Sequence, residues 1–156
     1  SNRMNESFAI SILEGKRAKY VARDQKLRIS SRLLRVGDSV PAHCSAPGKV
    51  LLAALTLDEL NNLLETDQPL EQCTEQSITD IAELKECLRK VRLQSWGTAE
   101  DEFELGMIAI AVPVFDQQGR VVAAMSVGST KQRRTVDELR EEFLPVLQDA
   151  AEKLSS

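Results

Sequence analysis

The stretch from residue 36 to residue 55, VGDSVPAHCSAPGKVLLAAL, constrains the fold more than any other part of the chain. In it a turn, an extended segment, a cluster of small residues and an apolar run follow one another without a spacer. The run VLLAAL predicts a buried helix. The order predicts the floor of a pocket, with small residues in front of the helix and apolar walls. The small residues are Ala46, Pro47 and Gly48, and the walls are Val36, Val40 and Ala42.

The start of this helix is suited to an anion. The first four N–H groups of a helix lack partners within it, and the aligned peptide dipoles favour negative charge there. We therefore expect free amides between Ala46 and Lys49 to receive a carboxylate or a phosphate. An ordinary loop that enters a core helix is the alternative that the same residues allow.

Length and composition fit one globular domain. The 156 residues are enough to bury about two thirds of the unfolded surface, and no apolar run approaches the ~20 residues of a membrane helix. We expect a tag or linker remnant over residues 1–6 and a single domain over residues 7–156. A net charge of −4 indicates no basic face for duplex DNA, so we do not expect this segment alone to bind DNA.

The chain has three cysteines, Cys44, Cys73 and Cys87. They are too far apart for a CxxC-type metal site and too few for a disulfide scaffold, which predicts reduced thiols in a cytoplasmic protein. His43 adjoins Cys44, but neighbours in an extended segment point to opposite faces, which argues against a thiolate–imidazole pair. Phosphate-loop, HExxH and GxSxG motifs are missing too. We expect no enzyme, metal site or cofactor.

Alternation of apolar residues predicts paired strands at two places. Residues 7–14, SFAISILE, and a second run through residues 20–22 predict a hairpin across Gly15 and Lys16. A third strand is expected over residues 26–34, KLRISSRLL. Residues 107–115, MIAIAVPVF, are apolar throughout and predict a central strand buried on both faces, with RVVAAMSVGS returning beside it.

Helix starts are marked by a Thr or Asp that precedes a Glu by three positions, the pattern of a capping box. It occurs at Thr56, at Asp80 and at Thr135, and each is followed by apolar residues at helical spacing. The segment 66–78 between the first two has no periodicity and predicts a loop.

An acidic cluster precedes the glycine that leads into the central strand. It comprises Glu100, Asp101, Glu102 and Glu104. Because no histidine lies nearby in the sequence, we favour a solvated loop or cap over a metal or general-acid site.

Two blocks of the sequence resemble the effector-binding domain of IclR-type bacterial transcription regulators. Residues 36–55 follow that domain's order of Gly, two residues, a hydrophobe, Pro, small residues and Gly-Lys before a Leu/Ala-rich helix. Residues 106–129, GMIAIAVPVFDQQGRVVAAMSVGS, are similar to its paired strands, in which an Ala-rich strand ends in Pro-hydrophobe-Asp and returns after a Gly turn. The resemblance covers Phe8 to Leu154. It implies an α/β (α+β), GAF/profilin-like fold with a central, largely antiparallel sheet flanked by helices.

The resemblance also implies what the chain binds. The expected ligand is a small-molecule effector, a small organic acid, that changes the geometry of a homodimer or tetramer; DNA would be bound only by an N-terminal winged helix-turn-helix domain absent from this chain, and no membrane is involved. Ser126 is expected to hydrogen-bond the effector and Arg32 to pair with its acid group. The full set of implied effector-binding residues is Ile29, Arg32, Val40, Ala42, Ala46, Pro47, Gly48, Ala99, Glu100, Met107, Ala109, Ser126 and Gly128.

Two departures from the family pattern favour one class of acid. Ala99 stands where relatives have an aspartate, and Gly128 stands where they often have a second serine. The site is therefore more apolar than one for small keto acids, which favours an aromatic or larger acid. The alternatives are a small cytosolic enzyme that uses Cys44 or the Glu100–Glu104 cluster, and a ligand-free dimerisation module.

Overall fold

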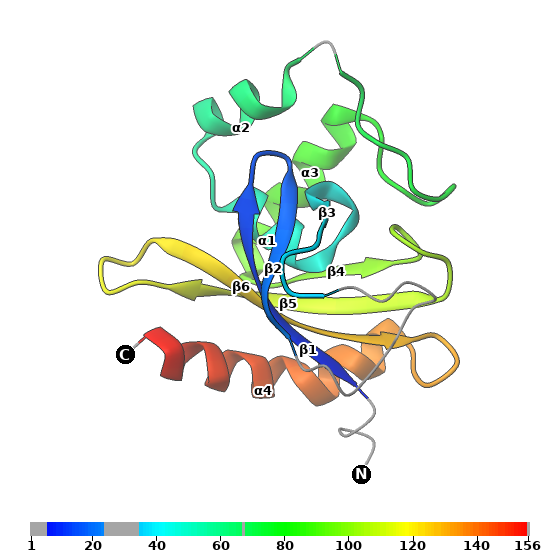
Figure 1. The fold of residues 1–156 in the computed structure, drawn as a ribbon, viewed down its shortest axis with the longest axis vertical. Helices are drawn as coiled ribbons and strands as arrows, with labels where there is room; N and C mark the ends of the chain where they lie inside the picture. Colours follow the sequence, from blue (N-terminus) through cyan, green and yellow to red (C-terminus); the bar gives the residue numbers. More distant parts are fainter. Residues whose placement is uncertain (1–5, 24–34, 67, 156) are drawn as a thin grey trace.

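The structure is a computed structural model that describes residues 6–23, 35–66 and 68–155. Figure 1 shows its sheet and helices in sequence colours. The strands are β1 (Ser7–Glu14), β2 (Arg17–Arg23), β3 (Ser39–Pro41), β4 (Gly97–Glu100), β5 (Met107–Phe115) and β6 (Val121–Thr130). The helices are η2, a 3₁₀ turn (Ala42–Cys44), α1 (Ala46–Ala53), α2 (Leu57–Leu64), α3 (Ile81–Gln94) and α4 (Val136–Ser155).

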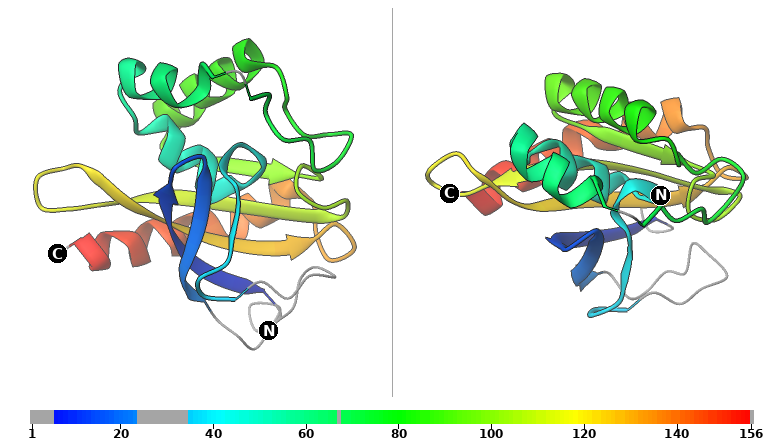
Figure 2. Two further views of the ribbon diagram at one scale, coloured as in Figure 1. Left: turned by 45° about the horizontal axis from the view of Figure 1, so that its top comes forward. Right: turned by 90° about the horizontal axis from the view of Figure 1, so that it is seen from above.

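The six strands form one antiparallel sheet in the order β3-β2-β1-β6-β5-β4. In Figures 1 and 2 the hairpin β1–β2 runs steeply across the direction of β4, β5 and β6, so the sheet is strongly curled. β2 has one extra residue, Val21, opposite Ile10 and Ser11 of β1, where the register of the hairpin shifts. The expected antiparallel sheet flanked by helices is confirmed.

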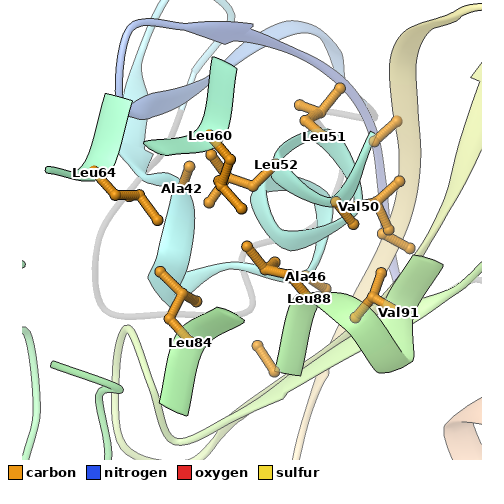
Figure 3. Close-up of a cluster of buried hydrophobic side chains, with 14 of the residues drawn as sticks. Ala42, Ala46, Val50, Leu51, Leu52, Leu60, Leu64, Leu84, Leu88 and Val91 are labelled. Atoms are coloured by element: carbon orange, nitrogen blue, oxygen red, sulfur yellow. The ribbon is translucent and has the colours of Figure 1, made fainter. Parts of the chain in front are cut away.

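Helices cover both faces of the sheet, and the alternation along each strand decides which side chain meets which helix. On one face Ile108, Ile110 and Val112 of β5 pack against Phe143 and Leu147 of α4. On the other face small residues meet α1 and α3, whose Val50, Leu52, Leu84, Leu88 and Val91 form the cluster in Figure 3. The prediction that β5 is buried on both faces is confirmed.

Most elements expected from the sequence are present. The first hairpin is confirmed, and Thr56 forms a complete capping box with Glu59. Asp80 accepts a hydrogen bond from the Glu83 amide at 2.9 Å, as expected for the start of α3. The third strand predicted over residues 26–34 lies outside the described residues. Within the described ranges, no helix is long and apolar enough to cross a membrane.

Two elements differ from the expectation. α1 begins at Ala46, so the small residues form its first turn instead of a loop before it. The strand β4, which was not predicted, leads into the acidic turn and pairs with β5 through Gly97 opposite Ala111 and Ala99 opposite Ala109. Four residues are too few for apolar alternation to reveal a strand.

Candidate functional site

A cavity lies between the start of α1 and the curled sheet, and small side chains make its floor. Ser7 of β1 lies opposite Gly128 of β6, which lies opposite Ala109 of β5, which lies opposite Ala99 of β4. All four line the cavity, together with Ala9 and Ser126 from the adjacent row. A row of Ser, Gly and Ala across four strands leaves space where larger side chains would close the sheet against α1.

The roof is formed by η2 and the first turn of α1. Ser45 is the N-cap of α1, and its Oγ accepts a hydrogen bond from the Gly48 amide at 2.9 Å. The Lys49 amide donates to the Ser45 carbonyl at 3.0 Å, and Pro47 has no N–H. The expectation of several free amides between Ala46 and Lys49 is therefore wrong, because the helix caps itself. This turn offers at most the Ala46 amide to a ligand.

Gly48 and Ala42 have a packing role that the sequence did not reveal. A Cβ atom on Gly48 would lie 2.1 Å from the carbonyl oxygen of Ala42, so only glycine lets η2 approach α1 this closely. Both residues thereby face each other, and neither lines the cavity. The third described candidate outside the lining is Glu100, which is exposed and pairs with Lys131 at 3.2 Å.

The other described candidates do line the cavity: Val40, Ala46, Pro47, Ala99, Met107, Ala109, Ser126 and Gly128. Ile29 and Arg32 lie outside the described residues. The structure adds residues that the sequence reasoning missed: Ser7, Ala9, Tyr20, Arg23, Cys44, Ser45, Glu102, Phe103 and Ile108. For Ser7 and Ala9 a signal existed, because β1 alternates small and large residues and its large side chains, Phe8, Ile10 and Ile12, pack with the α4 cluster.

Polar groups enter the cavity from β2. The Arg23 guanidinium lies 5.5 Å from the centroid of the Tyr20 ring, within the range of a cation–π contact. Burial raises the pKa of the Tyr20 hydroxyl, and this outweighs the opposite effect of the Arg23 charge. Tyr20 therefore stays neutral near pH 7 and can donate a hydrogen bond, beside a permanently charged arginine.

The carboxylates of the acidic cluster form ion pairs with two different lysines. Glu102 Oε2 lies 2.7 Å from Lys49 Nζ, and both side chains are largely buried. Asp101 accepts hydrogen bonds from Lys131 Nζ at 2.8 Å and from the Gly106 amide at 2.7 Å. In the described part of the chain no group of three or more His, Cys, Asp or Glu side chains is placed to hold a metal ion. These carboxylates stabilise the turn after β4.

The wall beside η2 carries the thiols and the histidine. His43 Nε2 lies 2.7 Å from the Glu71 carbonyl, and Cys44 Sγ lies 3.7 Å from Ser77 Oγ. Because residues 42–44 form a 3₁₀ turn, His43 Nε2 and Cys44 Sγ both reach the Glu71 carbonyl, the thiol at 3.9 Å. The expectation that these neighbours point apart is therefore wrong, since it assumed an extended backbone.

The cavity is empty of the protein's own side chains between Pro47 and Ser126. About 50 Å³ is open to the centres of water molecules. One water needs ~10–15 Å³ on that measure, so there is room for several waters or a small organic molecule. Its lining is mainly apolar, with Arg23, Tyr20, Glu102 and a few hydroxyls as polar groups. Such a composition is typical of a small-molecule binding site.

Comparisons with known proteins agree on one family. The family described as "Bacterial transcriptional regulator IclR C-terminal" matches residues 1–156. The Pca regulon regulatory protein of Pseudomonas putida is 36% identical over 155 residues, which cover 99% of this chain and 53% of that protein. The transcriptional regulator KdgR of Escherichia coli is 38% identical over 122 residues, 78% of this chain and 46% of that protein. The chain thus spans about half the length of these curated relatives.

Solved structures give the same result. The inducer-binding domain of a double mutant of PobR from Acinetobacter, in complex with 3-hydroxybenzoic acid, has a TM-score of 0.88 and 33% identity, covering 96% of this chain and 87% of that one. The C-terminal domain of E. coli KdgR has a TM-score of 0.83 and 33% identity, covering 99% of this chain and 88% of that one.

Proposed function

The chain belongs to the IclR C-terminal family of bacterial transcriptional regulators, and from this premise we propose that its cavity binds an aromatic carboxylic acid. The acid acts as the effector of a longer, cytoplasmic regulator whose DNA-binding domain lies outside this chain. The observation that carries the proposal is the position of Arg23 and Tyr20 beside a mainly apolar cavity, in whose lining the Glu102 carboxylate is already paired with Lys49. A guanidinium offers paired N–H donors to a carboxylate, and apolar walls receive a ring.

The lining supports a ring over a small keto acid. Phe103 and Met107 form one wall and Val40 another, and burying a ring there removes apolar surface from water. Ala99 and Gly128 add no polar group to the floor. A small keto acid has two oxygen-rich groups to satisfy and little apolar surface to bury, so it would gain less from this lining.

Hydroxyls near the floor and at β2 support a hydroxylated ring. Ser126 and Tyr20 both line the cavity, and each hydroxyl can donate or accept a hydrogen bond. The relative that binds 3-hydroxybenzoic acid, the PobR domain, supports this choice. So does the p-hydroxybenzoate hydroxylase transcriptional activator of Acinetobacter baylyi, which is 35% identical over 86% of this chain. The predicted contacts of Ile29 and Arg32 with the effector remain part of the proposal.

Regulation follows from linkage. An effector that binds one arrangement of a homodimer or tetramer more tightly shifts the protein toward that arrangement, and thereby the spacing of the attached DNA-binding domains. Turnover of the ligand is not part of the proposal. The acidic cluster that an enzyme would have used is occupied by Lys49 and Lys131.

Isothermal titration calorimetry of the purified chain tests the ligand class. The titrants are benzoate, 3-hydroxybenzoate and 4-hydroxybenzoate, with benzyl alcohol as a neutral ring and pyruvate as a small keto acid. We expect Arg23→Gln to weaken benzoate binding about tenfold or more, because a hydrogen bond to a charged group contributes about 1.5–3 kcal/mol and 1.4 kcal/mol is tenfold. Benzyl alcohol should bind the wild type and this variant alike.

The matched control is Arg89→Gln, because Arg89 is exposed on α3 and pairs only with Glu86 among the residues described. Equal benzoate affinities in wild type, Arg23→Gln and Arg89→Gln would place the acid group elsewhere. If none of the acids binds or raises the melting temperature, the ligand-free dimerisation module is the better description.

A further inference from the structure

Cys44 and Cys73 meet at the wall of the cavity although they are distant in the sequence. Cys44 Sγ lies 3.9 Å from the Glu71 carbonyl and 3.7 Å from Ser77 Oγ. The same Ser77 Oγ accepts a hydrogen bond from the Cys73 amide at 3.0 Å. Cys73 packs against the buried cluster of Ala18, Val40, Cys44 and Phe103. The irregular segment between α2 and α3 thus holds one thiol against the other.

The surroundings distinguish the two thiols. Burial raises the pKa of Cys44, but hydrogen bonds and charge from His43, with hydrogen bonds to Ser77 and Cys73, outweigh burial and lower it. The pKa of Cys73 is raised to about 12 by burial and by the neighbouring Cys44 and Glu71. A lowered pKa increases the thiolate fraction, and the thiolate is the reactive form. The lowered pKa and the position of Cys44 in the lining of the cavity favour Cys44 over Cys73 as the attacking sulfur.

His43 is oriented to support a thiolate. A carbonyl oxygen only accepts, so Nε2 carries the proton in the 2.7 Å contact with the Glu71 carbonyl. Burial lowers the pKa of His43, but hydrogen bonds to Cys44 and to that carbonyl outweigh it and raise the pKa. An imidazolium beside Cys44 stabilises negative charge on sulfur and is a proton donor to a leaving group.

Small oxidants can reach this pair. Cys44 is buried in the fold but lines the cavity, which has room for water-sized molecules. Cys73 is half-buried. The third thiol, Cys87, lies on α3 and packs against the other core cluster, and burial is the largest cause of its raised pKa. Cys87 has no thiol partner among the described residues, so it serves as the internal control thiol in an oxidation experiment.

We propose that Cys44 and Cys73 are an oxidation site at which hydrogen peroxide drives formation of an intramolecular disulfide across the wall of the cavity. In the first step the Cys44 thiolate attacks the peroxide, a sulfur–oxygen bond forms and the O–O bond breaks. The leaving hydroxide takes a proton from His43 and departs as water, and Cys44 becomes a sulfenic acid. In the second step the Cys73 sulfur attacks that sulfenic sulfur. The S–S bond forms, the S–O bond breaks, and hydroxide leaves as water with the Cys73 proton.

The disulfide couples oxidation to the cavity, and this part rests on the proposed function. A ligand in the cavity covers Cys44 and slows its oxidation. Conversely, a disulfide ties the segment around Cys73 to η2, whose neighbours Ala46 and Pro47 form the roof. Oxidation therefore changes the affinity for the ligand, and by linkage the ligand shifts the thiol–disulfide equilibrium by the same factor. The slower rate of oxidation comes separately, from the ligand covering Cys44.

The test uses the reduced, folded chain treated with hydrogen peroxide and then blocked with an alkylating reagent. Non-reducing peptide mass spectrometry should show a Cys44–Cys73 cross-link that lacks two hydrogen atoms, with Cys87 alkylated. Dithiothreitol should reverse it. Cys73→Ser should leave a Cys44 sulfenic acid that a cyclic 1,3-diketone traps, Cys44→Ser should leave Cys73 unoxidised, and the matched control Cys87→Ser should behave as wild type. Circular dichroism checks that each variant is folded.

The outcomes separate the two proposals. If Cys44 and Cys73 of the folded wild type stay alkylatable after peroxide treatment, or Cys87 is oxidised first, the oxidation site is overturned. With 3-hydroxybenzoate present we expect cross-linking to slow several-fold. A disulfide that forms at an unchanged rate while calorimetry shows the acid bound would overturn the coupling alone. A disulfide in a chain that binds no acid would support the oxidation site and contradict the proposed function.

Discussion

Lys49 of α1 and Glu102 of the turn after β4 form a buried ion pair, with Nζ 2.7 Å from Oε2 and side chains only 3% and 13% exposed. Lys49 Nζ also donates to the Thr98 carbonyl at 2.9 Å. A buried ammonium is tolerated only when it is paired and hydrogen-bonded, and both conditions hold here. The pair joins the roof of the cavity to its side wall, because Glu102 lines the cavity and Lys49 follows the small first turn of α1.

Lys49→Met should destabilise the domain by about 3–5 kcal/mol, because it leaves the Glu102 carboxylate buried without its partner. The melting temperature should fall by roughly 6–20 °C, since 1 kcal/mol corresponds to about 2–4 °C at this size. Chemical denaturation gives the free energy of unfolding directly. The matched control is Lys85→Met, which removes an exposed pair with Glu65 and should cost about 1 kcal/mol or less. Equal losses in the two variants would mean that the buried ion pair contributes no more to the free energy of unfolding than the exposed one.

Gly48→Ala should destabilise the domain although alanine normally favours a helix over glycine. Its Cβ would lie 2.1 Å from the Ala42 carbonyl oxygen and 2.4 Å from the Ala42 Cα, so the backbone of η2 must move. We expect a loss of at least the 1–3 kcal/mol typical of about one added methyl in a packed core. At Gly97 the nearest atoms are side-chain methyls of Val91 at 3.3 Å, which can shift. Thermal denaturation should therefore show a smaller loss for Gly97→Ala, and the reverse order would contradict this packing.

Ala109→Leu should abolish ligand binding while leaving the fold intact. Ala109 lies in the floor between Gly128 and Ala99, so a leucine there projects into the cavity and fills empty space instead of displacing packed atoms. We expect benzoate affinity to fall more than tenfold, with a melting temperature within a few degrees of wild type. Val122→Leu, on the exposed side of β6, is the control that adds bulk outside the cavity. Unchanged affinity in Ala109→Leu would place the ligand elsewhere.

Local signals in the sequence were sufficient for most of the fold. Capping at Thr56 and Asp80 depends on residues three positions apart, and the β1–β2 hairpin depends on alternation within a few residues. The start of α1 was missed although Ser45 followed by Ala-Pro is itself a helix-start pattern. Small residues were assigned to a loop because they were expected to surround a ligand.

The site was harder to predict because its polar contacts join distant parts of the chain. Lys49 and Glu102 meet only because β4 pairs with β5 beside α1. Small residues at Ala99, Ala109, Ser126 and Gly128 were expected to line a cavity, and they do. Arg23 reaches the cavity only because the sheet curls. The local sequence of β2 therefore does not distinguish Arg23 from the other arginines.

Acid should weaken the turn that carries Asp101. Hydrogen bonds from Lys131 and from the Gly106 amide hold the pKa of Asp101 below its usual value, against a smaller effect of burial. A carboxyl with a depressed pKa in the folded state contributes stability that is complete above its unfolded pKa of about 3.9 and is lost as the pH falls through the depressed value. The free energy of unfolding should therefore decrease below about pH 4.

Asp101→Asn isolates this contribution. Asp101 has a positive φ of 62°, a conformation that asparagine also tolerates, so the backbone is not perturbed. The variant should be less stable than wild type at pH 7 and should lose less stability between pH 4 and pH 2, because asparagine does not titrate. Lys131→Met should reduce the same acid dependence in part, since the Gly106 hydrogen bond at 2.7 Å remains. Urea denaturation at several pH values measures both slopes, and parallel curves for wild type and Asp101→Asn would show that Asp101 does not contribute to acid sensitivity.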